Sequence, residues 1–307
     1  MFRFNNDYNR GAHPAVLQAL AQTNEENYPG YGADQWCERA QAEILKHLGG
    51  VKAQVHFIVG GTPTNATLIA AALRPWQSVI SVDTGHINAH EAGSIELTGH
   101  KVLAVPAENG KLTARAVEAE CRKYLDGGAP DYLTQPRMAY VSSPSEFGTV
   151  YSKAELEALS AVCKKYGLYL FLDGARLGYW LASEGCDVTL ADLARLTDAF
   201  YIGGTKCGAL FGEAVVITDP QLKVGFRSMI KRQGGMFAKG RLLGVQFSAL
   251  LEDGVLAPGL DKLYAESSWL WAQTSTHRTL CAENFARSMP DVPLKAIVNA
   301  PAHALPT

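Results

Sequence analysis

The chain has 307 residues, of which 47% are hydrophobic and 19% charged, and its formal net charge is −2. This composition is typical of a soluble globular protein and shows no basic excess that would indicate binding to nucleic acid or an anionic membrane. The first residues lack an apolar signal-peptide core and no apolar run could span a bilayer, so a cytoplasmic location is expected. The length suggests one large domain, 1–254, and a partial second one, 255–307.

Short apolar runs rich in β-branched residues alternate with longer segments of helical periodicity. This alternation predicts an α/β fold with a mostly parallel sheet between crossover helices. Two helices are predicted at Thr64–Leu73 and Ser152–Tyr166, the second starting at a capping box of Ser152 and Glu155, and a surface loop is expected at Asp126–Pro136. The candidate strands are Val55–Val59, Ser78–Val82, His100–Val105, Met138–Ser142, Leu168–Leu172, Ala199–Ile202 and Ala214–Ile217.

The first segment with chemical promise is His56–Asn65, a strand followed by a glycine-rich turn and a helix with Pro63 near its start. The open N–H groups and the dipole of a helix N-terminus attract anions, so a ligand phosphate could lie on Gly61 and Thr62. The motif is short, and glycines at a strand-to-helix turn are common wherever α/β units pack closely.

Two histidines follow in Asp83–Gly93. The imidazole of His86 could stack on a flat ring ligand and exchange protons with a substrate, and His90 would share a helix face with it. Zinc is the rival interpretation, but Glu91 follows the pair rather than standing between the histidines, and no third ligand presents itself. No metal is therefore predicted, and His90 is better explained as a polar residue near a pocket rim.

The strongest local signal is Leu168–Arg176, an apolar strand that ends in Asp173, a Gly-Ala step and Arg176. An aspartate at the carboxyl end of a buried strand faces the crevice where α/β sheets bind ligands, and in pyridoxal phosphate enzymes such an aspartate pairs with the pyridinium nitrogen. The alternative is an N-cap for a helix that begins near Ala175. Arg176 could bind a substrate carboxylate, contact the cofactor's phenolic oxygen or form a structural ion pair. Because the helix dipole disfavours a cation there, a ligand or an acid partner is expected.

A second apolar strand leads into the glycine-rich turn of Ala199–Gly208, which carries Lys206. A lysine directly after a buried strand can be partly desolvated, which favours the neutral amine that a Schiff base requires. Taken alone, such a lysine is more often a surface residue at a strand end. Its position downstream of the Asp173 strand favours the functional interpretation.

With these segments in hand, the chain resembles the threonine aldolase and β-eliminating lyase group, within the aspartate aminotransferase type of pyridoxal phosphate enzymes. The resemblance runs from about Asn6 to Gly254 and implies the aminotransferase-like large domain, with its seven-stranded type of sheet. Each motif alone is weak, but their shared order and spacing are specific. The motifs are PGYG (Pro29–Gly32), GGTPTN (Gly60–Asn65), HINAHEAG (His86–Gly93), DGAR (Asp173–Arg176) and GGTK (Gly203–Lys206).

The resemblance implies a role for each matching residue. Catalytic pockets in this group form between the subunits of a dimer that often pairs into a tetramer, so a homodimer or homotetramer is implied. The implied assignments are Lys206 as the Schiff-base lysine, Asp173 as the pyridinium partner, His86 as the stacking residue, Gly61 and Thr62 as the phosphate cradle, Arg176 as a substrate-carboxylate ligand, and Tyr31 as a residue that approaches a neighbouring subunit's site.

The chain departs from the family pattern at three places. Glu146 stands in a loop where members often carry a histidine, and it could accept the substrate hydroxyl proton. Phe237 stands where many members have an arginine, which leaves Lys239 or Arg241 for a phosphate contact. After about Tyr264 the family character is lost and the periodicity is weak, so the small C-terminal domain is expected to be truncated, frameshifted or divergent.

The implied reaction is pyridoxal 5'-phosphate-dependent cleavage of L-threonine, L-allo-threonine or a similar β-hydroxy-α-amino acid to glycine and an aldehyde. The base could be His86, Glu146 or a bound water. The alternatives are β-elimination, transamination or racemisation of an amino acid, and a noncatalytic remnant. A nucleotide-binding Rossmann protein is disfavoured because Gly60 and Gly61 are adjacent and no G-x-G-x-x-G opens the first βα unit.

Overall fold

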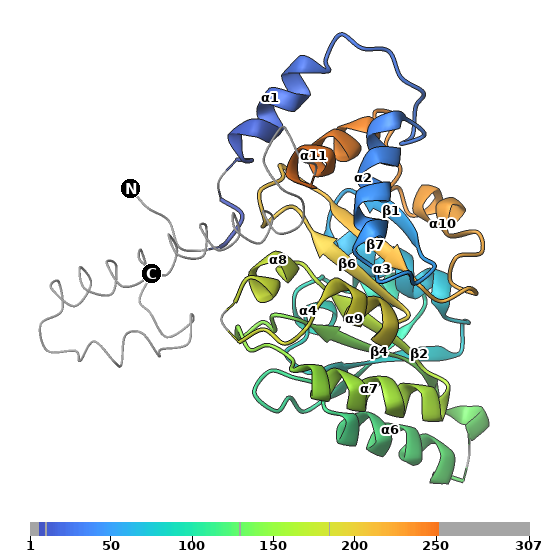
Figure 1. Cartoon of the computed structure of the whole chain (residues 1–307). Helices are drawn as coiled ribbons and strands as arrows, with labels where there is room; N and C mark the ends of the chain where they lie inside the picture. The colour runs from blue at the N-terminus through green and yellow to red at the C-terminus, as the bar shows by residue number, and fades with distance from the viewer. Residues whose placement is uncertain (1–5, 10, 129, 184, 252–307) are drawn as a thin grey trace, which may run out of the picture.

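The computed structural model describes residues 6–9, 11–128, 130–183 and 185–251 (Figure 1). Seven strands form one sheet in the order β1-β7-β6-β5-β4-β2-β3, in which β7 runs antiparallel to both β1 and β6 and the other neighbours are parallel. The predicted α/β fold with a mostly parallel sheet is confirmed, and every predicted strand overlaps an observed one. The strands are β1 (Gln54–Ile58), β2 (Gln77–Val82), β3 (Lys101–Val105), β4 (Gln135–Ser142), β5 (Tyr169–Asp173), β6 (Ala199–Gly203) and β7 (Glu213–Ile217).

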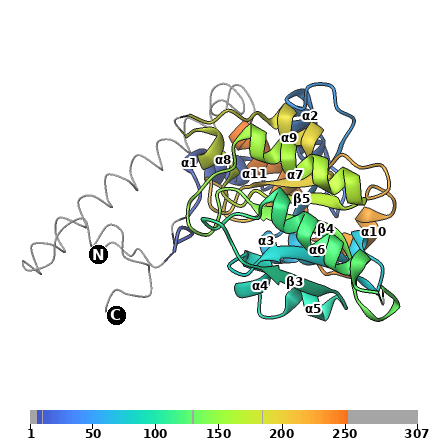
Figure 2. The same cartoon turned by 90° about the horizontal axis from the view of Figure 1, so that it is seen from below.

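Helices cover both faces of the sheet. Figure 2 shows α7 and α9 on one side of the strands and α3, α4 and α5 on the other. No helix of the described segments is both long and apolar enough to cross a membrane. The helices are α1 (Pro14–Gln22), α2 (Gln35–Lys46), α3 (Gly61–Ala72), α4 (His86–Ala89), α5 (Ser94–Leu97), α6 (Ala114–Asp126), α7 (Lys153–Tyr166), α8 (Leu177–Leu181), α9 (Leu190–Leu196), α10 (Phe226–Arg232) and α11 (Arg241–Leu251).

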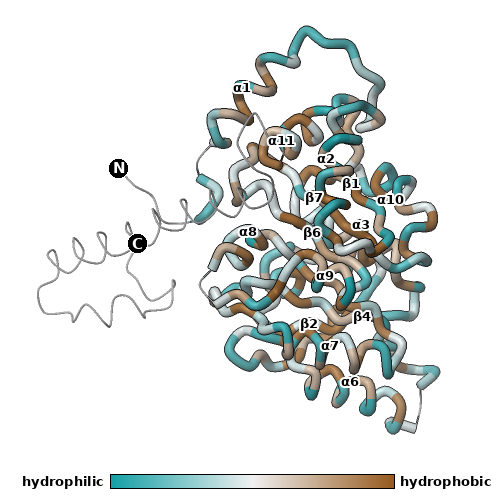
Figure 3. Tube along the Cα trace, viewed as in Figure 1, coloured by the Kyte–Doolittle hydropathy of each residue, from teal (hydrophilic) through white to brown (hydrophobic). Residues whose placement is uncertain are grey.

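Two hydrophobic cores lie on the two faces of the sheet, because successive side chains of a strand point to opposite sides. In β5, Leu170 and Leu172 pack into the core beneath α7 and α9. Tyr169 and Phe171 pack into the other core, beneath α3 and α10. In Figure 3 hydrophobic residues gather along the central strands and hydrophilic ones on the outer loops. The alternation places Asp173, two residues after Phe171, on the α3 face.

Local signals explain where several elements begin and end. The predicted capping box is confirmed: Ser152 accepts from the backbone N–H of Glu155, whose carboxylate accepts from the backbone N–H of Ser152. The helix ends at Gly167, which has a left-handed φ of 68° that glycine adopts without strain. Helix α3 starts at Gly61, three residues earlier than predicted. Its N-cap is Gly60, and Pro63 is compatible with the first turn because the N–H it lacks would have no partner there.

The predicted loop at 126–136 is only partly a loop. Asp126 is the last residue of α6, Pro130–Tyr132 forms a 3-10 turn, and Gln135 and Pro136 already belong to β4. The composition was misleading because Pro136 pairs at Ser78, where the register of β2 and β4 shifts and a missing N–H is tolerated. The predicted second domain, 255–307, lies outside the described residues.

Candidate active site

Asp173 is the most firmly held polar group at the carboxyl ends of the strands, and it is 5% exposed. Tyr140 and Tyr201, from the strands on either side, both donate hydrogen bonds to its carboxylate. The amide of Asn65 donates to Oδ2 at 3.3 Å, and the backbone N–H of Ala175 donates to Oδ1 at 3.0 Å. Burial and the nearby charge of Asp173 raise the pKa of both tyrosines well above the usual value, so they remain donors. Four donors thus fix this carboxylate in one orientation and offset the cost of burying it.

A second buried carboxylate, Glu91, lies beyond the amide of Asn65, which donates to Glu91 Oε1 at 2.7 Å. Glu91 also accepts from Ser94 Oγ and is 2.7 Å from Nδ1 of His86. Because a carboxylate can only accept, Nδ1 of His86 carries the hydrogen, which leaves Nε2 as the basic nitrogen of the neutral ring. This hydrogen bond raises the pKa of His86 above its usual value, although burial opposes the shift. The charge of Asp173 also raises this pKa and that of Lys206 lowers it. Asn65 donates to both Glu91 and Asp173, so His86, Glu91, Asn65 and Asp173 form one network.

Lys206 follows β6 in the turn 204–212, and its side chain is 14% exposed. Its Nζ lies 4.0 Å from Oδ1 of Asp7 and 5.8 Å from the ring centroid of Tyr8. The hydroxyl of Tyr179 donates to the backbone carbonyl of Lys206 at 2.7 Å. The N-terminal segment therefore lies beside the amine of Lys206, and Tyr179 of α8 holds the backbone of the same residue.

Arg176 pairs with the same Asp7. Its Nε donates to one oxygen of that carboxylate, and Nη2 donates to the other at 3.3 Å. Burial would lower the pKa of Arg176, but the hydrogen bond and charge of Asp7 raise it. Arg176 is the N-cap of α8, which begins at Leu177, so it has the acid partner expected there, and Asp173 is not the cap residue.

Glu146 lies in the loop between β4 and α7. Its Oε1 accepts from the backbone N–H of His86 and from Ser142 Oγ, both at 2.9 Å. Its Oε2 is buried without a hydrogen-bond partner among the described residues. A buried acceptor without a donor is costly, so this oxygen marks a position where a ligand could donate a hydrogen bond. The charge of Glu146 also acts on Arg176.

Gly61 and Thr62 form the first turn of α3, where backbone N–H groups have no partner within the helix. A side chain at Gly61 would place its Cβ 3.2 Å from the hydroxyl of Tyr201, so this turn lies directly beside the polar residues described above. This group, called the Asp173 cluster below, consists of Asp7, Asn65, His86, Glu91, Tyr140, Glu146, Asp173, Arg176, Tyr201 and Lys206. An anion at the start of α3 would thus lie near Asp173, the last residue of β5, and near the turn after β6 that carries Lys206.

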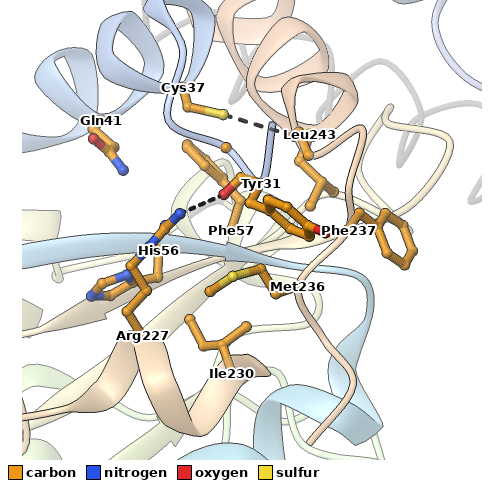
Figure 4. A pocket seen from close by; sticks show the side chains of 12 residues that line it. Tyr31, Cys37, Gln41, His56, Phe57, Arg227, Ile230, Met236, Phe237 and Leu243 are labelled. Carbon is orange, nitrogen blue, oxygen red and sulfur yellow. Dashed lines mark hydrogen bonds between the residues drawn. The ribbon is translucent and has the colours of Figure 1, made fainter. Parts of the chain in front are cut away.

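Tyr31 lies apart from this cluster. It has a left-handed φ of 64°, is 44% exposed and lines a separate pocket (Figure 4). In that pocket Arg227 Nη2 donates to the carbonyl oxygen of Tyr31 at 2.8 Å, and Phe237 and Met236 stand close to the tyrosine ring. Burial and the charge of Arg227 lower the pKa of His56 in this pocket to about 4.

Other residues considered in the sequence analysis lie outside the cluster. His90 is exposed at the end of α4, with its ring centroid 5.8 Å from that of His86. Arg241 stacks over the ring of Tyr28 and reaches the hydroxyl of Thr23. Within the part of the chain that the structure describes, neither Arg241 nor Phe237 interacts with the Asp173 cluster.

Several residues of the cluster are not predicted from the sequence. Asn65 and Glu91 lie inside the GGTPTN and HINAHEAG motifs, so their position beside the motif glycines and His86 is a sequence signal that could indicate them. The two tyrosines on Asp173 lie inside predicted strands, where no pattern marked them. Asp7 stands far from its partners in the chain, and no local pattern links them. The residues concerned are Asp7, Asn65, Glu91, Tyr140 and Tyr201.

Comparison with known sequences identifies the relatives of this chain. Residues 7–289 match the family model described as β-eliminating lyase. The chain is 31% identical over 293 residues to the low specificity L-threonine aldolase of Pseudomonas aeruginosa, covering 95% of this chain and 79% of that protein. It is 26% identical to the low specificity L-threonine aldolase of Saccharomyces cerevisiae, covering 86% of this chain and 70% of that one.

Comparison with solved structures agrees. A threonine aldolase of Leishmania major superposes with a TM-score of 0.83 at 42% identity, covering 92% of this chain and 78% of that one. An aspartate aminotransferase variant of Thermus thermophilus superposes with a TM-score of 0.67 at 17% identity, over 92% of this chain and 70% of that one, which shows a shared fold. From the family match over most of its length and the identity to these relatives, the chain belongs to the threonine aldolase and β-eliminating lyase family.

Proposed function

We propose that this protein cleaves the Cα–Cβ bond of L-threonine, L-allo-threonine or a similar β-hydroxy-α-amino acid, giving glycine and an aldehyde, with pyridoxal 5'-phosphate as its cofactor. The observation that carries the proposal is the buried Asp173 carboxylate, held by four donors and linked through Asn65 and Glu91 to His86. Lys206 lies in the turn that follows the neighbouring strand β6. The relatives named as low specificity L-threonine aldolases support the substrate class.

The residues present fit this cofactor. The fixed carboxylate of Asp173 suits a pyridinium nitrogen, the amine of Lys206 suits an aldehyde, and the open first turn of α3 at Gly61 and Thr62 suits a phosphate. His86, held by Glu91, would lie against the ring. When bound, pyridoxal phosphate withdraws electrons from Cα of the substrate and stabilises the charge left when the bond breaks.

The remaining residues would bind the substrate and move its proton. The planar fork of Arg176 suits the substrate carboxylate once Asp7 gives way. Two bases are available for the β-hydroxyl proton: Nε2 of His86 and the unpartnered Oε2 of Glu146. Removing that proton lets the hydroxyl carbon become a carbonyl as the Cα–Cβ bond opens.

Assembly and location are part of the same proposal. We expect a homodimer or homotetramer, in which Tyr31 reaches the site of a neighbouring subunit, because it is partly exposed and lines a pocket that includes no residue of the Asp173 cluster. A cytoplasmic location stays a prediction from the sequence.

The first test is chemical. We expect borohydride reduction of the protein with pyridoxal phosphate, followed by peptide mass analysis, to place a pyridoxyl group on Lys206, and Lys206→Ala to abolish it. Lys101, an exposed lysine, is the internal control and should stay unlabelled after brief treatment. A pyridoxyl group on another lysine, or on none, would contradict the cofactor assignment.

Product analysis then tests the reaction. The loaded protein should release acetaldehyde and glycine from L-threonine at a higher kcat/KM than it releases pyruvate from serine or cysteine. Pyruvate as the main product would instead indicate β-elimination, and an exchanged amino group transamination. Loss of optical activity without cleavage would indicate racemisation. Cofactor on Lys206 with none of these products would indicate a noncatalytic protein.

A further inference from the structure

Glu213 is a buried acid at the base of the turn that carries Lys206. It is the first residue of β7 and is 3% exposed. Its Oε1 accepts from the hydroxyl of Thr205 at 3.0 Å, and its Oε2 accepts from the backbone N–H of Gly204 at 3.2 Å. One carboxyl group therefore holds the two residues that directly precede Lys206.

The same hydroxyl ties the other end of the turn. Thr205 Oγ1 accepts from the backbone N–H of Gly212 at 3.0 Å, while the carbonyl of Gly212 accepts from the N–H groups of Gly204 and Thr205 at 3.0 and 3.2 Å. A Cβ at Gly204 would lie 2.7 Å from that carbonyl oxygen, so the backbones at the two ends of the turn are in close contact. The turn is thus closed by a network with Glu213 and Thr205 at its centre.

We propose that Glu213 is a positioning residue for Lys206: through Thr205 and Gly204 its carboxyl group fixes the turn, and so sets where the amine of Lys206 stands and which charge it faces. This role rests on the proposed function, in which Lys206 bonds the cofactor. Glu213 has no assigned part in that chemistry, and a buried carboxyl that costs free energy to bury needs a compensating role.

The charge on Glu213 depends on pH in the working range. Burial raises the pKa of this carboxyl to about 8, and the charge of Asp173 adds to the rise, while the hydrogen bonds from Thr205 and Gly204 and the charge of Lys206 oppose it. Below that value the carboxyl holds its proton, and above it a negative charge appears beside the lysine. The other groups on which its charge acts are Tyr201 of β6 and Cys207 of the turn. An ionised Glu213 adds a negative charge at the base of the turn that carries the amine, so the pH dependence of the reactivity of Lys206 should change slope at about pH 8.

Labelling of the cofactor-free protein tests this without any turnover. Reductive methylation with formaldehyde and cyanoborohydride, read by peptide mass analysis, gives the rate at Lys206 relative to exposed Lys101 as a function of pH. In the natural protein we expect the ratio to bend near pH 8. Glu213→Gln keeps an acceptor for the N–H of Gly204 and, like the protonated carboxyl, has a donor for the hydroxyl oxygen of Thr205, but it has no proton to lose. The bend should therefore disappear while the ratio below pH 8 stays near the original.

Removing the support should have a different effect. With Glu213→Ala the turn loosens, so methylation of Lys206 should approach the rate at Lys101. Trapping of pyridoxal phosphate by borohydride should slow by up to about 100-fold, as expected when a reacting group is displaced by about 1 Å. Thr205→Val should behave like Glu213→Ala, and Thr205→Ser, which keeps the hydroxyl, should behave like the natural protein.

Asp198→Ala, which removes a carboxyl acceptor as Glu213→Ala does, is the matched control. Asp198 accepts from the backbone N–H of Leu170 at 2.7 Å, at the opposite end of the strands. Its loss should lower the melting temperature without changing the rate ratio at Lys206. If Glu213→Ala and Glu213→Gln also lower only the melting temperature, Glu213 is structural and the proposal is wrong. Since the methylation readout needs neither cofactor nor threonine, this failure would be distinct from a failure of the proposed reaction.

Discussion

The carboxylate of Asp7 occupies the fork of Arg176, where the carboxylate of a substrate is expected to bind. Both Arg176 contacts end on Asp7 oxygens, and Lys206 is within 4.0 Å of one of them. Asp7 therefore supplies, from the same chain, the charge that an amino-acid substrate would bring. In the proposed function, where Arg176 binds the substrate carboxylate, binding therefore exchanges one carboxylate for another.

We expect Asp7→Asn to lower KM for L-threonine severalfold with little change in kcat, because it removes the competing carboxylate and leaves the groups near the reacting bonds in place. Asp7 and Arg176 are each about a third exposed, so the lost ion pair should cost no more than about 1 kcal/mol of stability. Steady-state kinetics at fixed pH check the prediction. The matched control is Glu108→Gln, which removes an exposed pair with Arg115 and should leave KM unchanged. A higher KM for Asp7→Asn would mean that Asp7 aligns Arg176 for the substrate.

At the scale of elements, the backbones at the ends of β5 and β6 are in direct contact, in addition to the hydrogen bond from Tyr201 to Asp173. The N–H of Gly203 donates to the carbonyl of Gly174 at 2.9 Å. A Cβ at Gly174 would lie 1.9 Å from the carbonyl oxygen of Tyr201, and one at Gly203 would lie 2.2 Å from that of Ala175. Neither position has room for a side chain, so the spacing between the Asp173 and Lys206 segments is fixed by main-chain contact.

We therefore expect Gly174→Ala to cost about 1–3 kcal/mol or more, since backbone atoms rather than a flexible side chain must move. Urea unfolding measures the cost as a lower midpoint at an unchanged slope. Gly11→Ala is the control: no heavy atom lies within 4 Å of its added Cβ, so its midpoint should hold or rise slightly. A Gly174→Ala protein as stable as Gly11→Ala would show that the two strand ends are not in the close contact described.

The elements also show how far sequence patterns reach. An apolar run that gives way to a polar residue is a local signal. Asp173, at the end of β5, and Lys206, in the turn after β6, could therefore be recognised as candidates from the sequence. Tyr140 and Tyr201 could not, because strands buried on both faces lack the alternation that tells which side a residue faces. Arg176 and Asp7 are 169 residues apart, and only the folded chain brings them together. The missed helices, such as α2 and α11, pack on each other and on β1, so their position too depends on tertiary contacts.

At the scale of the whole molecule, the position of Tyr31 makes assembly testable. Lys206→Ala and Tyr31→Ala should each be inactive alone. If Tyr31 serves a neighbouring subunit, mixing the two unfolded chains and refolding them should restore about a quarter of the natural activity, because half of the dimers are mixed and each has one complete site. Recovery is measured as acetaldehyde release. No recovery despite mixed dimers, seen by mass, would mean that Tyr31 acts within its own chain.

The loop that carries Glu146 has a consequence for how this protein can diversify. The four donors to Asp173 come from strands, from α3 and from the backbone after β5, whereas Glu146 stands on a connecting loop and is positioned by Ser142 and the backbone of His86. Loops tolerate exchange far better than the strands that they join. Mutation can therefore vary Glu146, one of the two bases proposed for the substrate's β-hydroxyl proton, while the rest of the site is inherited intact. Descendants of this chain could then acquire new amino-acid preferences in single steps.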